Sequence, residues 1–136
     1  MSQHLSVRVD EDVLARLDSE SRRVGRSRSW LAKRLLDEGL RMERHPGIVF
    51  RSGPAGRRAG LMSGPDVWEV VRAAVGYERT REDGAEQAGL TPEQVGVALR
   101  YYAEHSNEIE DWIRMVDEEA ERAEADWRSE QQLLAR

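Results

Sequence analysis

The chain begins with an alternation of apolar and polar residues that predicts a β-strand over residues 5–9. Successive side chains of a strand point to opposite faces, so alternate residues share a face. One face carries Leu5, Val7 and Val9, and the other carries His4, Ser6 and Arg8. We therefore expect the apolar face to lie on a core and the polar face to meet a ligand.

No second strand follows nearby, and a strand without a neighbour leaves its backbone groups unpaired. We expect the same strand of a second copy to be its partner. Two such strands about a two-fold axis form a ribbon, and a two-stranded ribbon fits the major groove of B-DNA. In that groove Arg8 could bond guanine with two N–H groups, and Ser6 could bond several bases.

Two helical patterns follow, separated by Gly25, a residue type that commonly ends helices. Asp10 is suited to cap the first helix and Ser27 to cap the second. Apolar residues recur at helical spacing in both. Together with the strand, these positions predict a dimer core formed by Leu5, Val7, Val9, Leu14, Leu17, Leu31 and Leu35.

The turn at residues 26–29 gathers guanidinium groups, hydroxyls and the free N–H groups of a helix start. This combination suits a DNA phosphate and would clamp the ribbon onto the duplex. The complete set of expected DNA contacts is His4, Ser6, Arg8, Arg26, Ser27, Arg28 and Ser29.

The order of strand, helix, Gly-x-Ser-Arg-Ser turn and helix resembles the ribbon-helix-helix family of CopG-, Arc- and MetJ-type repressors. The resemblance ends near Met42 and implies an intertwined dimer whose strands enter the major groove. His4, Ser6 and Arg8 occupy the matching outward positions. The alternation by itself leaves a second interpretation open, in which the strand completes some other sheet.

Residues 45–64 are rich in Gly, Pro and Arg, which excludes a continuous helix and predicts a short hairpin or ordered loop. Three capped helical segments follow. The first runs from Asp66 to Gly76. The second begins at Thr80, and the third at Thr91 with proline in its first position. We expect domain limits of 1–44, 45–105 and 106–136.

The stretch 45–113 resembles a homeodomain-like domain of unknown function that occurs in antitoxins encoded beside PIN-like toxins. The resemblance rests on His-Pro-Gly-Ile-Val-Phe, Gly-Pro-Ala-Gly-Arg-Arg and Leu-Thr-Pro-Glu-Gln-Val, followed by Tyr-Tyr. It implies the setting of a toxin-antitoxin pair. Apart from Glu93 and Arg100, the third helix has almost no charge. We therefore expect this domain to be a spacer or interaction surface, although its helix-turn-helix spacing leaves DNA reading open.

The last segment is predicted to be a long amphipathic helix, because its apolar residues are spaced by threes and fours. Ala120 and Ala123 thin its apolar stripe, so it needs a partner to be stable. A toxin protein is the expected partner, and a coiled coil with the second copy is the alternative. The residues expected to bind the toxin are Trp112, Ile113, Val116, Arg122, Trp127, Arg128, Leu133 and Leu134.

The charge distribution separates the two halves of the chain further. The whole chain carries a net charge of −5. Residues 1–60 hold 13 basic and 8 acidic residues, whereas the remainder holds 8 basic and 18 acidic ones. A basic head is attracted to phosphate, and an acidic rear suits a partner of opposite charge. Ordinary surface charge is the plain alternative.

Enzymatic chemistry finds no support in the sequence. His4, His45 and His105 are isolated along the chain, and no metal-ligand spacing or phosphate-binding glycine motif is present. We therefore expect no catalytic residue, no metal and no cofactor. No apolar run approaches the roughly 18 residues of a membrane span, and a signal-peptide pattern is lacking. We expect a cytoplasmic protein without a membrane partner.

Together with the two resemblances, these patterns predict a mainly α protein: a ribbon-helix-helix dimer head, a small helical domain of helix-turn-helix type and a long C-terminal helix. Its expected function is that of an antitoxin. Such a protein would bind operator DNA as a homodimer or a higher assembly, repress its own operon and neutralise a PIN-like ribonuclease toxin through its C-terminal region. The alternative is a stand-alone ribbon-helix-helix repressor whose tail mediates self-assembly.

Overall fold

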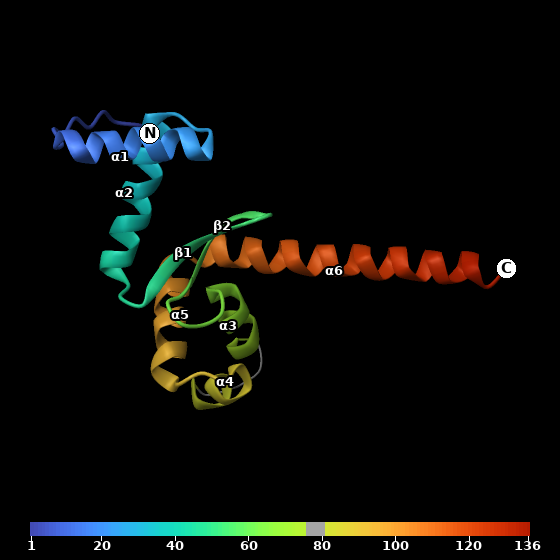
Figure 1. The fold of residues 1–136 in the computed structure, drawn as a ribbon. Coiled ribbons are helices and arrows are strands. Elements are labelled where there is room, and N and C mark those ends of the chain that lie inside the picture. The colour runs from blue at the N-terminus through green and yellow to red at the C-terminus, as the bar shows by residue number, and fades with distance from the viewer. Residues whose placement is uncertain (76–80) are drawn as a thin grey trace. The chain divides into compact units, whose positions relative to one another are not determined.

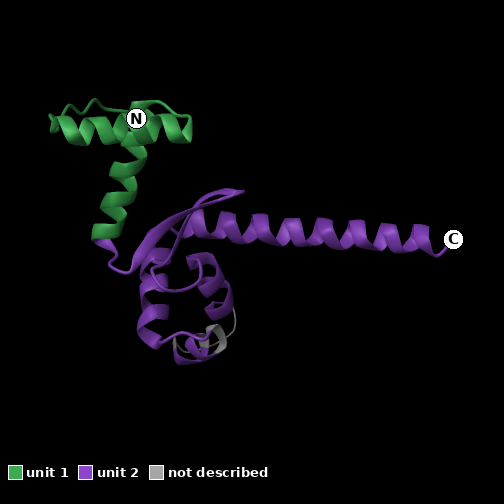
Figure 2. Ribbon diagram, in the orientation of Figure 1, with its two compact units in different colours: residues 1–43 green, residues 44–136 purple. Residues whose placement is uncertain are grey.

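The computed structural model describes residues 1–75 and 81–136 and is mainly helical, which confirms the predicted fold class. Two compact units divide the chain, residues 1–43 (unit 1) and 44–136 (unit 2; Figure 2). In chain order the elements are α1 (Glu11–Val24), α2 (Arg28–Arg44), β1 (Ile48–Gly53), β2 (Gly56–Leu61), α3 (Val67–Ala74), α4 (Arg81–Ala88), α5 (Pro92–Glu104) and α6 (Ser106–Leu134; Figure 1).

Unit 1 consists of an N-terminal segment, residues 1–10, followed by α1 and most of α2. α1 begins after Asp10 and carries acidic residues in its first turn, where they favour the positive end of the helix. It ends at Gly25, whose φ of 69° lies in the left-handed region. The Gly25 N–H donates to the carbonyl of Arg22, which closes the helix end and lets the chain turn toward α2.

The N-terminal segment forms no strand in the single chain. Residues 5–9 carry no regular secondary structure, and the sheet found among the described residues belongs to unit 2. A strand is defined by the ladder it shares with a neighbour. Because the expected neighbour is the same segment of a second copy, one chain alone leaves this strand unpaired.

The stretch after α2 contains a hairpin, one of the two forms expected there. β1 and β2 pair antiparallel, with Ile48 opposite Leu61 and Phe50 opposite Ala59. Ile48, Ala59 and Leu61 are buried, and Phe50 packs against the same core. The hairpin therefore lays one face on the core of unit 2.

Helices α3, α4 and α5 pack against one another, and α3 and α5 also contact the hairpin and α6. Tyr101 is fully buried at the centre of this core. Thr91 caps α5, because its side chain accepts the backbone N–H of Gln94 and its own N–H donates to the Gln94 side chain. Gly76 and Thr80, expected to end α3 and to begin α4, lie outside the described residues.

α6 has a packed beginning and an exposed remainder. Ile109 is buried and Ile113 packs against the core. From Glu118 to the C-terminus every residue is exposed. Among the described residues, no helix combines the length and the apolar character needed to cross a membrane.

Candidate nucleic-acid interface

The polar residues expected to read DNA lie on the N-terminal segment of unit 1. His4, Ser6 and Arg8 are all exposed. Nε2 of His4 and Oγ of Ser6 lie 3.1 Å apart, so these two side chains share a side. This is the arrangement that an alternating strand requires of positions two apart.

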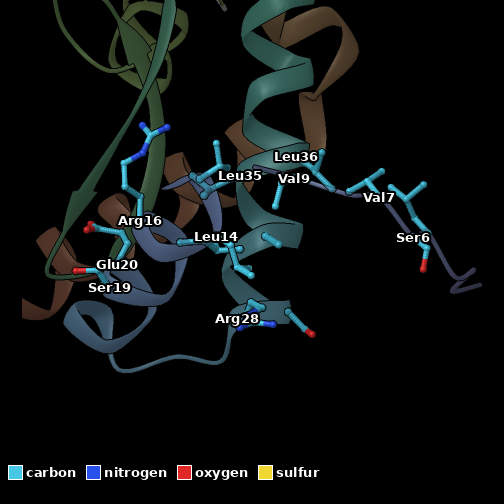
Figure 3. A pocket seen from close by; sticks show the side chains of 15 residues that line it. Ser6, Val7, Val9, Leu14, Arg16, Ser19, Glu20, Arg28, Leu35 and Leu36 are labelled. Atoms are coloured by element: carbon cyan, nitrogen blue, oxygen red, sulfur yellow. The ribbon is translucent and has the colours of Figure 1, made fainter. Parts of the chain in front are cut away.

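The apolar row of the same segment is also exposed. The exposed fractions are 67% for Leu5, 70% for Val7 and 48% for Val9. These side chains border an open hollow of about 860 Å³ that is lined by the segment, α1 and α2 (Figure 3). Its apolar lining consists of Leu5, Val7, Val9, Val13, Leu14, Leu17, Ala32, Leu35 and Leu36. Apolar side chains that gather around an open hollow are typical of a surface that a partner covers.

The helical residues of the expected dimer core occupy different environments in the single chain. Leu31 is fully buried. Leu14 and Leu17 are half-buried along the hollow, whereas Leu35 is exposed. Leu36, also exposed, was not among the expected core residues although it borders the hollow. Its place beside Leu35 widens the apolar stripe of α2, which is the feature that could have identified it.

The turn between α1 and α2 is fixed by hydrogen bonds of its own residues. The Trp30 N–H donates to Oγ of Ser27 at 3.1 Å, so Ser27 caps α2 as expected. The Arg26 N–H donates to the carbonyl of Ser21 at 3.1 Å, and the Ser21 hydroxyl donates back to the Arg26 carbonyl. Ser29 is exposed in the first turn of α2.

Arg28, one of the expected phosphate contacts, is held by an ion pair within the chain. Its Nε and a terminal nitrogen donate to the two carboxylate oxygens of Asp18 at 2.7 and 2.9 Å. This hydrogen bonding lowers the pKa of Asp18 and raises the pKa of Arg28. Arg28 therefore joins α1 to α2, and a phosphate would have to share it with Asp18.

Trp30 is a neighbour of the expected clamp that sequence reasoning left out. The Arg26 guanidinium carbon lies 4.7 Å from the centre of the Trp30 ring, and that of Arg34 lies 5.5 Å from it. A cation–π contact consumes no hydrogen-bond donor, so Arg26 keeps its N–H groups for a phosphate. The spacing of four residues between Trp30 and Arg34 on α2 is the sequence feature that predicts their contact, whereas Arg26 precedes the helix and no helical spacing predicts its contact.

The residues expected to bind a toxin all lie on α6 but differ in exposure. Trp112, Ile113 and Val116 are half-buried. Arg122 and Arg128 are exposed, and Arg128 pairs with Glu124 one turn away. The larger exposed apolar residues are Trp127 at 58%, Leu133 at 66% and Leu134 at 80%.

Two of the three histidines are not isolated once the chain is folded. His45 and His105 lie together with Glu104 in unit 2, and one ligand atom from each lies within 4.8 Å of the others. The expectation that these two histidines stand alone is therefore wrong. The contact joins residues far apart in sequence, so no local spacing could predict it.

Comparison with known families bears on unit 1. Residues 3–43 match the family model of ribbon-helix-helix proteins of the copG family. The match covers the N-terminal segment, α1 and all but the end of α2. Proteins of this family bind DNA and dimerise, so the matched region indicates a DNA-binding transcription regulator. Neither a curated protein nor a solved structure matches the chain.

Proposed function

We propose that the protein is an antitoxin that binds operator DNA as a dimer, represses its own operon and neutralises a PIN-like ribonuclease toxin through its C-terminal region. The observation that carries this proposal is the contrast between a DNA-binding head and a helix whose part from Glu118 onward is exposed. Each half of the molecule carries apolar side chains that one chain alone does not cover.

Features of unit 1 support the proposed dimer and its contact with DNA. A second N-terminal segment would pair with the first and bring a second set of Leu5, Val7 and Val9 over the hollow. The ribbon formed in this way would display His4, Ser6 and Arg8 twice, which suits a two-fold operator. The excess of basic residues in the first 60 positions favours approach to phosphate.

The exposed part of α6 supports a protein partner. Holding a helix in place costs conformational entropy, which buried apolar surface normally offsets. Trp127, Leu133 and Leu134 bury little in the single chain. Tryptophan is among the residues that most often dominate binding energy, so we assign Trp127 as an anchor.

The charges of α6 suit the nuclease class of partner. PIN-like nucleases gather carboxylates around a metal ion, and an arginine of the tail, Arg122, Arg128 or Arg136, would pair with such carboxylates. The many acidic residues around these arginines would repel RNA. They would favour a toxin whose RNA-binding groove has a basic rim. The resemblance of residues 45–113 to a domain of antitoxins adds support for this choice of partner.

A stand-alone repressor is the second candidate. The same apolar side chains of α6 would also serve a coiled coil between two copies. In that case removal of the exposed tail would change the size of the assembly, and a neighbouring gene would have no effect on growth.

The test is co-expression with the protein encoded by the adjacent reading frame, which should be small and rich in clustered carboxylates. The full chain should restore growth and co-purify with the toxin. A chain ending at Glu119 keeps Ile109 and Ile113 in the core, so it should still bind operator DNA as a dimer. It should nevertheless fail to rescue growth.

Single substitutions refine the comparison. Trp127→Ala should weaken rescue in part. Met62→Ala removes another large apolar side chain, 69% exposed and located after β2 instead of on α6, and should rescue fully. If the chain ending at Glu119 neutralises the toxin as well as the full chain does, the tail is not the toxin-binding element.

A further inference from the structure

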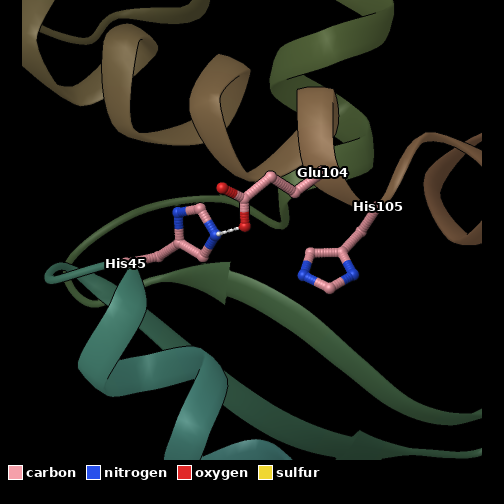
Figure 4. Close-up of side chains that lie close together, drawn as sticks. All are labelled: His45, Glu104 and His105. Atoms are coloured by element: carbon pink, nitrogen blue, oxygen red, sulfur yellow. Dashed lines mark hydrogen bonds and ion pairs between the residues drawn. The ribbon is translucent and has the colours of Figure 1, made fainter.

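His45, Glu104 and His105 form a cluster in unit 2 that the DNA-binding function does not use. His45 follows α2, Glu104 is the last residue of α5, and His105 joins α5 to α6. One nitrogen from each imidazole and one carboxylate oxygen lie within 4.8 Å of one another. Figure 4 shows the His45 ring facing the Glu104 carboxylate, with His105 projecting from the adjacent position of the chain.

The surroundings of His45 hold its imidazole in place. The residue is only 8% exposed, and Nε2 lies 2.9 Å from Oε2 of Glu104. The rings of Tyr101 and His105 stand nearly edge-on to it, with centroids 5.3 and 6.0 Å away. The buried Nε2 of His45 thus faces the Glu104 carboxylate, and the neighbouring aromatic rings fix the orientation of the His45 ring.

The two oxygens of Glu104 have separate neighbours. Oε1 accepts hydrogen bonds from Nε and a terminal nitrogen of Arg44 at 3.2 and 3.0 Å, whereas Oε2 faces His45. A carboxylate oriented through one oxygen while the other faces an imidazole is the arrangement that outer partners give to metal ligands.

We propose that His45, Glu104 and His105 bind a divalent transition-metal ion of the zinc type. The ligands are Nε2 of His45, Oε2 of Glu104 and one ring nitrogen of His105. Imidazole and carboxylate together suit zinc and its neighbours, and three protein ligands leave a position open for water or a further group. The proposal is independent of the toxin and of the DNA contact.

Metal binding would draw the three ligand atoms closer together than the 4.8 Å within which they lie. Zinc bonds to nitrogen and oxygen of roughly 2.0–2.2 Å place tetrahedral ligands about 3.3 Å apart. Glu104 is exposed and His105 half-buried, and both side chains would have to move toward the buried His45. The contact between Nε2 of His45 and Oε2 of Glu104 would give way to bonds from both atoms to the metal, because zinc binds an unprotonated imidazole nitrogen.

The metal would join two parts of unit 2 that are distant in sequence. His45 and Glu104 are 59 residues apart. Their common ion would fix the start of the hairpin to the junction of α5 and α6, and it would leave the exposed part of α6 untouched. Zinc should therefore raise the unfolding temperature of unit 2, and a chelator should reverse the effect.

The first experiment measures zinc binding by the untagged full chain with a competing chromophoric chelator. We expect one zinc ion per chain. Glu104→Gln and His105→Asn should each weaken the affinity by about 100-fold or more. His4→Asn is the matched control, because it removes the third histidine of the chain from the other unit, and it should bind zinc like the wild type.

A second measurement needs no variant and so does not depend on the variants folding. Ring nitrogen signals of the three histidines are followed by NMR while zinc is added to the wild-type chain. His45 and His105 should shift together and His4 should not. If zinc binds without moving these two rings, or if no zinc is retained at micromolar concentration, the cluster is an ion pair alone and the proposal is wrong.

Discussion

A terminal nitrogen of Arg51 donates to Oδ1 of Asp66 at 3.2 Å, so the hairpin is joined to the residue that precedes α3. The second oxygen of Asp66 accepts a hydrogen bond from Nε of Arg58 on the other strand. Asp66 is only 8% exposed, and its own N–H donates to the Glu69 side chain at 2.9 Å. A single carboxylate therefore connects β1, β2 and α3.

Asp66→Asn should destabilise unit 2 by about 2 kcal/mol, because it leaves two partly buried guanidinium groups facing each other without their counter-ion. Asp117→Asn is the matched control, since it breaks the exposed pair with Arg72 and should cost under about 1 kcal/mol. Urea unfolding of the full chain measures both. Equal urea midpoints for the two variants would mean that the ion pairs of Asp66 stabilise the fold no more than the exposed pair of Asp117 does.

The ion pair of Asp18 with Arg28 should make unit 1 sensitive to acid. Arg28 lowers the pKa of Asp18 mainly through its hydrogen bonds. A carboxyl with a lower pKa in the folded state stabilises the fold above its unfolded pKa, and this contribution is lost as pH falls through the folded pKa. NMR titration should place the pKa of Asp18 below its ordinary value in the wild type. In Arg28→Ala it should return toward that value, and an unchanged pKa would contradict this account of the pair.

The exposed hollow of unit 1 predicts an obligate dimer whose stability depends on concentration. Val7→Asp would place a charge in the apolar interface expected between two copies of unit 1. At micromolar concentration the variant chain should sediment as a monomer, with unit 1 unfolded or unpaired. Val75→Asp introduces the same charge at a valine of unit 2 that is 45% exposed and should leave the dimer intact. A wild-type head that is folded and monomeric under these conditions would exclude the ribbon.

Local patterns in the sequence predict much of unit 1. Asp10 and Gly25 mark the two ends of α1, and the structure places them there. The strand is different, because its backbone partners lie in another molecule. A single chain can show that Val7 is exposed, but it cannot show the ladder that would cover it.

Contacts between distant residues could not be predicted in the same way. Arg28 and Asp18 are ten residues apart on either side of a turn, where no helical spacing applies. His45 and Glu104 meet only because α5 packs beside the hairpin. Ile113 was expected to bind a partner, yet its packing against the core depends on the position at which α6 leaves α5. These outcomes follow from tertiary packing and not from local pattern.

Arg8 and Arg26 should affect DNA binding in different ways, because one is expected to meet a base and the other a phosphate. Arg8→Ala should relax the sequence preference and cost about 1–3 kcal/mol at the base it reads. Arg26→Ala should weaken all sequences alike and reduce the salt slope by about 1 for each phosphate that is no longer neutralised. Arg28→Ala should have a smaller effect than Arg26→Ala, since Asp18 already holds that guanidinium.

Operator and scrambled duplexes titrated at several salt concentrations separate these outcomes. Arg114→Ala serves as the control, because it removes the same charge from an exposed arginine of α6 that pairs with Asp111. It should leave both the affinity and the salt slope nearly unchanged. A hydrogen bond to a base contributes only where the matching base is present. A phosphate contact releases counter-ions and so contributes to the affinity for every DNA sequence. If Arg8→Ala retains the wild-type preference for its operator, the N-terminal segment is not the part of the protein that reads DNA.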